Sequence, residues 1–160
     1  MKFKYDEYAI HEIAPRKCVT FSIPDVEPNE EATQTWEWYL SEDKELPDNF
    51  ETFGYTTRTN YGCLWFGDNR LNKIKWHLGY NWHYTIQMVS YLPKNKPCCQ
   101  TIVISRTRDG LDFVFMMRAI RESYIPVDFY CFYQFARTIA EHLDKPINNI
   151  TAFAAKITGG

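Results

Sequence analysis

Residues 97–118 read PCCQTIVISRTRDGLDFVFMMR, and this stretch decides the expected fold. Residues 100–107 and 111–117 are rich in β-branched and aromatic side chains, which favour strands. The triplet RDG at 108–110 is typical of a turn, because Asp and Gly adopt turn conformations at little cost. The stretch therefore predicts a β-hairpin, a motif that returns the chain to the place where it started.

The two ends of this hairpin carry a thiol and a guanidinium. Cys98 stands at the start and Arg118 follows twenty residues later, so we expect the two side chains to lie close together. A neighbouring cation favours the thiolate form of a cysteine, and arginine binds phosphate through paired hydrogen bonds. The pair thus indicates a nucleophile beside an anion site. The alternative is a buried structural cysteine and a surface arginine, since free cysteine is among the most buried residue types.

Two further features flank the hairpin. Cys98 and Cys99 are adjacent, and successive side chains of a strand point to opposite faces, so at most one of them belongs to a pocket. We expect no disulfide between them. A small basic cluster, either a solvated edge or a site for an anion or a partner, is expected from Lys94, Lys96, Arg106 and Arg108.

Length and composition narrow the class of protein. The 160 residues are expected to form a single domain, 1–160, and the 45% hydrophobic content argues against disorder. The net charge is −2, so there is no overall basic field and no nucleic-acid partner is indicated. The five cysteines form no CxxC pattern, so a structural zinc site is not expected. Without an apolar signal core or a membrane-length apolar run, we expect a cytoplasmic protein with free thiols and no membrane association.

The rest of the chain mixes strands and helices. Two helices have clear patterns: residues 30–40, with Trp36, Tyr39 and Leu40 on one side, and residues 68–78, with Asp68 as cap and Gly79 as stop. The other expected elements are strands at 17–23, 84–92 and 147–158 and a helix at 128–143, and residues 41–60 are expected to form a loop. Without regular βαβ alternation, this order favours an α+β fold with a mixed, largely antiparallel sheet and helices packed on one face.

The helix at 128–143 is more apolar than one contact surface requires. Phe132, Ala136, Ile139 and Leu143 form an apolar stripe, and Pro126 stands just ahead of it. The full set of aromatic side chains on this helix is wider, comprising Phe129, Tyr130, Phe132, Tyr133 and Phe135. The excess predicts a second buried surface, and a symmetric homodimer is a common way to provide one.

The order of helix, strand, Pro-Cys, hairpin, Arg, Pro-x-Asp and long helix resembles the thymidylate synthase family, which includes the deoxycytidylate hydroxymethylases. The likeness covers about residues 60–158. It begins at Tyr61-Gly62 and is clearest at Pro97-Cys98, which is similar to the family's nucleophile motif. The interval from Cys98 to Arg118 is the family's interval, and Pro126-Val127-Asp128 is similar to the family's Pro-x-Asn.

This resemblance implies a specific chemistry. Cys98 would be the nucleophile that adds to C6 of a pyrimidine nucleotide, after which C5 attacks a one-carbon unit carried by 5,10-methylenetetrahydrofolate. Arg118 would bind the nucleotide phosphate, and Tyr61 would stand near C5. The resemblance also implies a homodimer in which the sheet packs against its twin.

Asp128 carries the expected choice of base. Relatives acting on uracil have Asn at this place, whereas those acting on cytosine tend to have Asp. A carboxylate accepts from the exocyclic amine of cytosine, whereas uracil offers an acceptor there, so the resemblance implies a cytosine nucleotide. Asp is also a favoured N-cap, so the residue has a compatible structural interpretation at the start of its helix.

Several positions depart from the family's pattern. Cys99 stands where histidine usually follows the nucleophile, and the family's Arg-Ser-x-Asp is replaced by residues 118–121, RAIR. Glu37 lies near the place of the catalytic glutamate but out of register. The alternative function is therefore a non-catalytic thymidylate synthase-like dimer that binds a nucleotide or a protein partner. A third alternative is an unrelated α+β protein with a coincidental Cys-Arg spacing.

Overall fold

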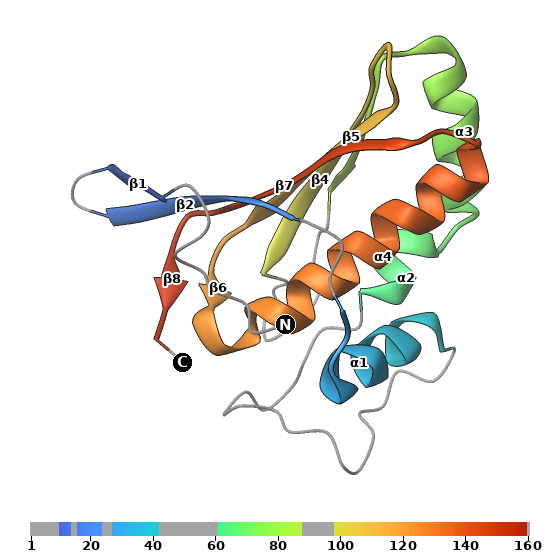
Figure 1. Cartoon of the computed structure of the whole chain (residues 1–160). Coiled ribbons are helices and arrows are strands. Elements are labelled where there is room, and N and C mark those ends of the chain that lie inside the picture. Colours follow the sequence, from blue (N-terminus) through green and yellow to red (C-terminus); the bar gives the residue numbers. More distant parts are fainter. Residues whose placement is uncertain (1–9, 14–15, 24–26, 42–60, 88–97, 160) are drawn as a thin grey trace.

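A six-stranded sheet forms one layer of the computed structural model, which describes residues 10–13, 16–23, 27–41, 61–87 and 98–159 (Figure 1). The strands follow the order β1-β2-β7-β5-β4-β3, and all neighbours are antiparallel except β5 and β7. Their bounds are Ile10–Ile13 (β1), Arg16–Ser22 (β2), His83–Gln87 (β3), Cys99–Arg106 (β4), Leu111–Met117 (β5) and Ile147–Ala154 (β7). A separate parallel pair joins β6 (Ile120–Arg121) to β8 (Ile157–Thr158).

The helices lie on one side of this sheet. They are α1 (Glu30–Leu40), α2 (Gly62–Phe66), α3 (Arg70–Tyr80), the 3-10 turn η2 (Glu122–Tyr124) and α4 (Ile125–Leu143). In Figure 1, α4 runs along the sheet, α1 lies beyond α4, and α3 stands at the end of the molecule formed by the β4–β5 turn. The expected α+β class with a mostly antiparallel sheet is confirmed.

The core lies between the sheet and α4. Along β5, Phe113 and Phe115 are fully buried, whereas Met116 on the opposite face is 42% exposed. The ring of Phe115 stacks on that of Phe132 in α4, with centroids 4.2 Å apart and planes 17° from parallel. Alternation along a strand thus gives the sheet one covered face.

The predicted second surface of α4 is covered by the chain's own α1. These two helices pack together, and the hydroxyls of Thr35 and Tyr124 lie 3.3 Å apart where α1 meets the start of α4. Phe129, Tyr130, Phe132 and Phe135 are all buried. The aromatic excess therefore predicted a second contact correctly, but the partner is a helix of the same chain, so the excess is no argument for a dimer.

Three local predictions were wrong. In α1 the buried face includes Trp38 and Tyr39, whereas Leu40 is 57% exposed. The third helix runs from Arg70 to Tyr80, so Gly79 lies inside it, and Asp68 precedes the N-cap with a left-handed φ of 57°. α4 begins at Ile125, three residues earlier than expected.

The short helix α2 was not predicted from the sequence. It contributes the fully buried Trp65 to the core. The expected loop at 41–60, apart from Ser41, and residues 88–92 of the expected strand at 84–92 lie outside the described residues. So do Lys94 and Lys96 of the basic cluster.

Candidate functional site

The β4–β5 hairpin brings Cys98 and Arg118 together, as predicted. The backbone N–H of Arg118 donates to the carbonyl of Cys98 at 2.7 Å. Nη2 of Arg118 lies 3.9 Å from Sγ of Cys98, which is a contact between a cation and a sulfur. The thiol is half-buried and the guanidinium is exposed, so both are within reach of a molecule in solution.

A β-bulge at the start of β4 directly follows the two adjacent cysteines. Cys99 faces Met117 and Thr101 faces Met116, so Gln100 is an extra residue in β4. A bulge re-aims the side chains on either side of it. As a result Cys99 is fully buried with the core residues of β4, while Cys98 remains half-buried. Of the two cysteines only Cys98 is therefore accessible to solvent, and its place in a pocket stays a prediction.

Tyr61 lies beneath the cysteines rather than at the surface. Its hydroxyl oxygen accepts a hydrogen bond from the backbone N–H of Cys99 at 3.0 Å, and its ring stacks on Trp65 at 5.2 Å. The side chain is 8% exposed. Burial raises the pKa of the phenol well above its usual value, and the nearby thiol of Cys99 adds to this effect. Tyr61 therefore stays protonated at neutral pH and holds the start of β4 in place.

Asp128 lies in the first turn of α4 and is half-buried. Burial raises the pKa of the Cys99 thiol, and the negative charge of Asp128 raises it further. The same charge contributes to the raised pKa of Tyr61. The carboxylate therefore lies within electrostatic range of the buried side chains of Tyr61 and Cys99.

The N-cap interpretation of Asp128 was wrong. The N-cap of α4 is Tyr124, and Pro126 stands in the first positions of the helix. A carboxylate in the first turn of a helix is still favoured by the helix dipole, although Asp128 does not cap the first backbone N–H groups of α4.

Two residues considered for the family's remaining roles lie elsewhere. Glu37 is exposed on α1, within electrostatic range of Tyr130. Arg121, which occupies the place of the family's aspartate, is half-buried in β6 opposite Thr158 of β8. The structure therefore groups Cys98, Arg118, Tyr61 and Asp128, and supplies no described glutamate beside them.

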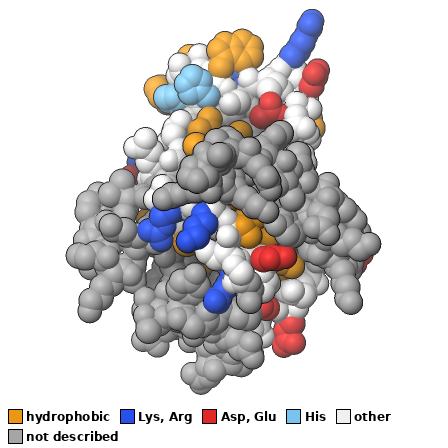
Figure 2. All heavy atoms as spheres, turned by 90° about the vertical axis from the view of Figure 1, so that its left-hand side faces the viewer, with side chains coloured by type: hydrophobic (Ala, Val, Ile, Leu, Met, Phe, Trp, Pro, Cys, Tyr) orange, Lys and Arg blue, Asp and Glu red, His pale blue; other side chains and the backbone are white. Residues whose placement is uncertain are grey.

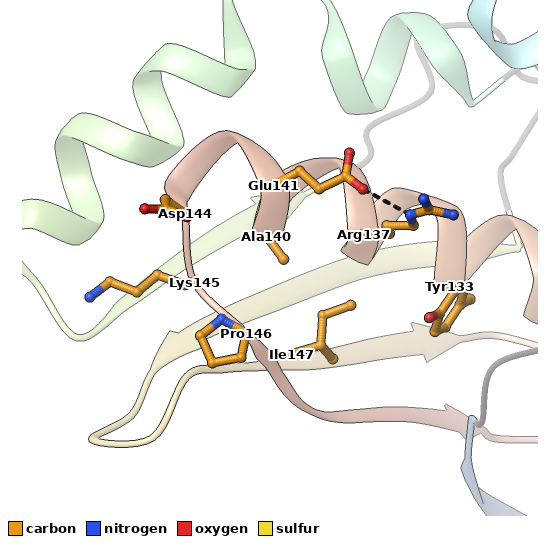
Figure 3. A pocket seen from close by; sticks show the side chains of 8 residues that line it. All are labelled: Tyr133, Arg137, Ala140, Glu141, Asp144, Lys145, Pro146 and Ile147. Carbon is orange, nitrogen blue, oxygen red and sulfur yellow. Dashed lines mark hydrogen bonds and ion pairs between the residues drawn. The ribbon is translucent and has the colours of Figure 1, made fainter.

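Two hollows lie apart from these residues. One, of about 520 Å³, lies between the C-terminal end of α4 and the start of β7. Figure 3 shows that the side chain of Lys145 points out of it, and that Arg137 and Glu141 on α4 form an ion pair at 2.8 Å. The other, of about 370 Å³, lies beside α3. Sequence reasoning did not predict this second hollow, and the signal for it was the run of aromatic and basic residues in α3.

Comparisons with known proteins do not assign this chain to a family. No protein-family model matches the sequence, and no curated protein matches it. Within the described ranges, no three His, Cys, Asp or Glu side chains gather in a way that could hold a metal ion. Among the same residues, no helix has the length and apolar character needed to cross a membrane.

Proposed function

We propose that this protein is a pyrimidine nucleotide C5 methyl- or hydroxymethyltransferase that acts through a cysteine adduct on a cytosine nucleotide. The observation that supports it best is the 3.9 Å contact between Sγ of Cys98 and Nη2 of Arg118. A solvent-accessible thiol beside a guanidinium combines a possible nucleophile with a group that binds phosphate.

In the proposed reaction Sγ of Cys98 forms a bond to C6 of the pyrimidine ring. The electrons of the C5–C6 double bond then make C5 a nucleophile, which takes up an electrophile. Loss of the original C5 proton and departure of the thiolate from C6 restore the ring. Such covalent addition divides one difficult substitution into easier steps. Arg118 binds the nucleotide phosphate through its exposed guanidinium.

Asp128 supplies the proposed preference for cytosine. Its carboxylate can only accept hydrogen bonds at neutral pH, and the exocyclic amine of cytosine is a donor. Tyr61 has a positioning role in this proposal, because its hydroxyl already accepts from Cys99 and its ring is buried. It fixes the backbone from which Cys98 projects.

The described residues do not fit the folate donor as the family holds it. A pterin ring offers amine and amide N–H groups that require an acceptor, and a guanidinium, which Arg121 has at this place, is a donor only. Glu122 is the adjacent acid and is exposed in η2. The proposal of methylenetetrahydrofolate as the one-carbon source rests on the resemblance alone.

The test is tritium release from C5-labelled deoxycytidylate and deoxyuridylate, with and without methylenetetrahydrofolate. Adduct formation alone labilises the C5 proton, so release from deoxycytidylate is expected and should disappear in Cys98→Ala. Arg118→Gln should raise the KM for nucleotide, whereas Arg137→Gln, which removes an exposed arginine from α4, should not. Release from deoxyuridylate alone would overturn the cytosine assignment. No release from either nucleotide by the folded protein would overturn the enzyme.

A non-catalytic thymidylate synthase-like protein that binds a nucleotide or a protein partner is the second candidate. The burial of Tyr61 and the arginine at position 121 favour it, because both remove groups that would meet substrates. Binding of deoxycytidylate by calorimetry, unchanged in Cys98→Ala and without tritium release, would distinguish this candidate from the enzyme.

A homodimer through the open face of the sheet belongs to either candidate. On this face Val103, Val114 and Phe153 are only partly buried and Met116 is 42% exposed. A dimer of twice the 19.0 kDa chain mass is expected in sedimentation equilibrium. Val114→Lys should dissociate it, since a charge placed in an apolar interface is costly. A monomeric wild-type protein would contradict the dimer.

A further inference from the structure

The charges of this protein are strongly segregated along the chain. Between positions 69 and 108 there is no Asp or Glu and there are seven Lys or Arg, although the whole protein has a net charge of −2. An overall charge near zero therefore conceals a basic region, and a local basic field attracts polyanions whatever the total charge is.

Exposed aromatic side chains lie in the same segment. Trp76, Tyr80 and Trp82 are 67%, 76% and 64% exposed, which is unusual for rings of this size. They lie on α3 and in the short connection from α3 to β3. Figure 2 shows hydrophobic and histidine side chains gathered at the upper end of the molecule, which is the end that α3 and the β4–β5 turn form in Figure 1.

The rings on α3 form a continuous surface. Trp76 and Tyr80 are one helical turn apart, with ring centroids separated by 5.4 Å. Beside them is the hollow of about 370 Å³, lined by Asn69, Asn72, Lys73, Trp76, His77 and Tyr84. Amide, ammonium and imidazole groups surround this hollow, and no aliphatic side chain of the described residues lines it.

Trp82 is fixed next to the turn of the hairpin. The guanidinium of Arg106 lies 4.8 Å from the centroid of the Trp82 ring. The backbone N–H of Arg106 also donates to the carbonyl of Trp82 at 2.6 Å. This double contact holds an exposed ring and a cation side by side. A polyanion that stacks a flat group on this ring would thus meet a positive charge at the same place.

Three of the described cations in this segment have no described acidic partner. Asp68 pairs with Lys73, and Asp109 stands at the hairpin turn. No described carboxylate pairs with Lys75, Arg106 or Arg108. A Lys or Arg side chain that is not paired with a carboxylate of the protein can pair with a phosphate instead. This pairing releases the cations that surround the nucleic acid.

We propose that this surface binds single-stranded nucleic acid. Bases stack on the rings of Trp76, Tyr80 and Trp82, and phosphates contact Lys75, Arg106 and Arg108. Flat aromatic rings beside cations are the elements by which proteins hold single strands without reading their sequence. Trp and Tyr also occur at membrane and protein interfaces. The hollow beside these rings has no described aliphatic lining and is surrounded by amide, ammonium and imidazole groups, which suit phosphates and base edges better than acyl chains.

This surface is separate from the proposed reaction site. Arg106 and Cys99 occupy opposite ends of β4, so the aromatic rings lie at the turn of the hairpin and the thiol at its open end. Substitutions of Trp76 or Trp82 should therefore leave tritium release unchanged. Loss of nucleic-acid binding and loss of nucleotide chemistry can be measured independently in the same protein.

The test uses the full chain and fluorescein-labelled oligo(dT) and oligo(rU) of twenty nucleotides, read by anisotropy across a salt series. Binding is expected at low salt, with quenching of the protein's tryptophan fluorescence. Trp76→Ala and Trp82→Ala should each weaken it roughly five- to hundredfold. Lys75→Gln and Arg108→Gln should each make the slope of log K against log salt about 0.7 less negative. The matched controls Leu40→Ala and Arg137→Gln, which alter an exposed apolar residue and an exposed cation elsewhere, should change neither quantity.

Three results would overturn the proposal. One is the absence of binding at low salt. Another is binding that competes with heparin but is unaffected by both tryptophan variants, which would show charge attraction without stacking. The third is a preference of the same surface for vesicles of phosphatidylserine over both oligonucleotides, lost in the same two variants, which would make it a lipid-binding surface.

Discussion

The hydroxyl of Tyr61 and the backbone N–H of Cys99 are joined by a hydrogen bond of 3.0 Å across 38 positions of sequence. Tyr61 directly precedes α2, and Cys99 is the first residue of β4. The bond therefore links the helical layer to the start of β4, which directly follows Cys98. Because the acceptor is buried among the rings of Tyr39 and Trp65, water cannot replace it.

Tyr61→Phe should destabilise the protein by about 1–3 kcal/mol, because it leaves a buried backbone N–H without an acceptor. Urea unfolding followed by circular dichroism measures this change. Tyr80→Phe is the matched control, since that ring is 76% exposed, and it should stay within about 0.5 kcal/mol of wild type. Equal stabilities of the two variants would show that the Tyr61 bond contributes nothing.

Stability should fall in alkali from about pH 9 upward. The pKa values of Cys99 and Tyr61 are both raised by burial above their usual 9.0 and 10.0, so the folded protein keeps protons that the unfolded chain has lost. The stabilisation is complete below pH 9 and is lost as the pH rises, at up to about 1.4 kcal/mol per pH unit for each group. Urea midpoints at pH 7, 8, 9, 10 and 11 measure it.

Two variants show how much of this fall in stability with pH comes from Cys99 and how much from Tyr61. Cys99→Ala should remove the part that begins near pH 9, and Tyr61→Phe the part that begins near pH 10. Slopes that are the same in wild type and in both variants would place the alkaline loss elsewhere in the protein.

The hairpin and the Cys98–Arg118 contact could be predicted because both depend on local sequence. Two strand-like runs around an RDG turn fix the pairing, and the pairing fixes which ends meet. The prediction needed no knowledge of the other elements. The bulge at Gln100 could not be predicted, because no Gly or Pro marks it. It puts Cys99 rather than Gln100 on the core face, together with Ile102 and Ile104.

The bounds of the helices were harder to predict, because the residues that mark them are ambiguous. α2 has five residues, too few to display a helical period, and its glycine and aromatics are weak helix formers. Gly79 is typical of a helix end but lies inside α3. The early start of α4 was visible in the sequence, since Pro126 is favoured in the first turn of a helix.

Gly110→Ala and Gly79→Ala should have opposite effects on stability. A Cβ at Gly110 would stand 2.4 Å from the carbonyl oxygen of Pro146, so the hairpin turn would have to move away from the start of β7. That carbonyl also accepts from Leu111 at 2.9 Å, so the shift strains a hydrogen bond. We expect a loss of about 1–3 kcal/mol.

Gly79 lies within α3, and a methyl group added there would meet no described atom within 4 Å. Alanine at this position should stabilise the protein by about 0.4–1 kcal/mol, because it restricts the unfolded chain and is a better helix former. Thermal melts of the two variants beside wild type measure both shifts. A neutral Gly110→Ala would show that β7 yields to the hairpin turn at no cost.

The stacked rings of Phe115 and Phe132 should be energetically coupled. Both are buried, and their centroids are 4.2 Å apart. Phe115→Ala and Phe132→Ala should each cost about 3–5 kcal/mol, because each opens a cavity between β5 and α4. Met116→Ala, one residue along β5 on the open face, should cost far less.

The double variant measures the coupling between the two rings. An aromatic pair adds about 0.5–1.5 kcal/mol beyond the area it buries. The double variant should therefore lose less than the sum of the two single losses, by about that amount. Denaturant unfolding of the four proteins of this cycle measures the coupling, and strictly additive losses would show that the two rings merely fill space.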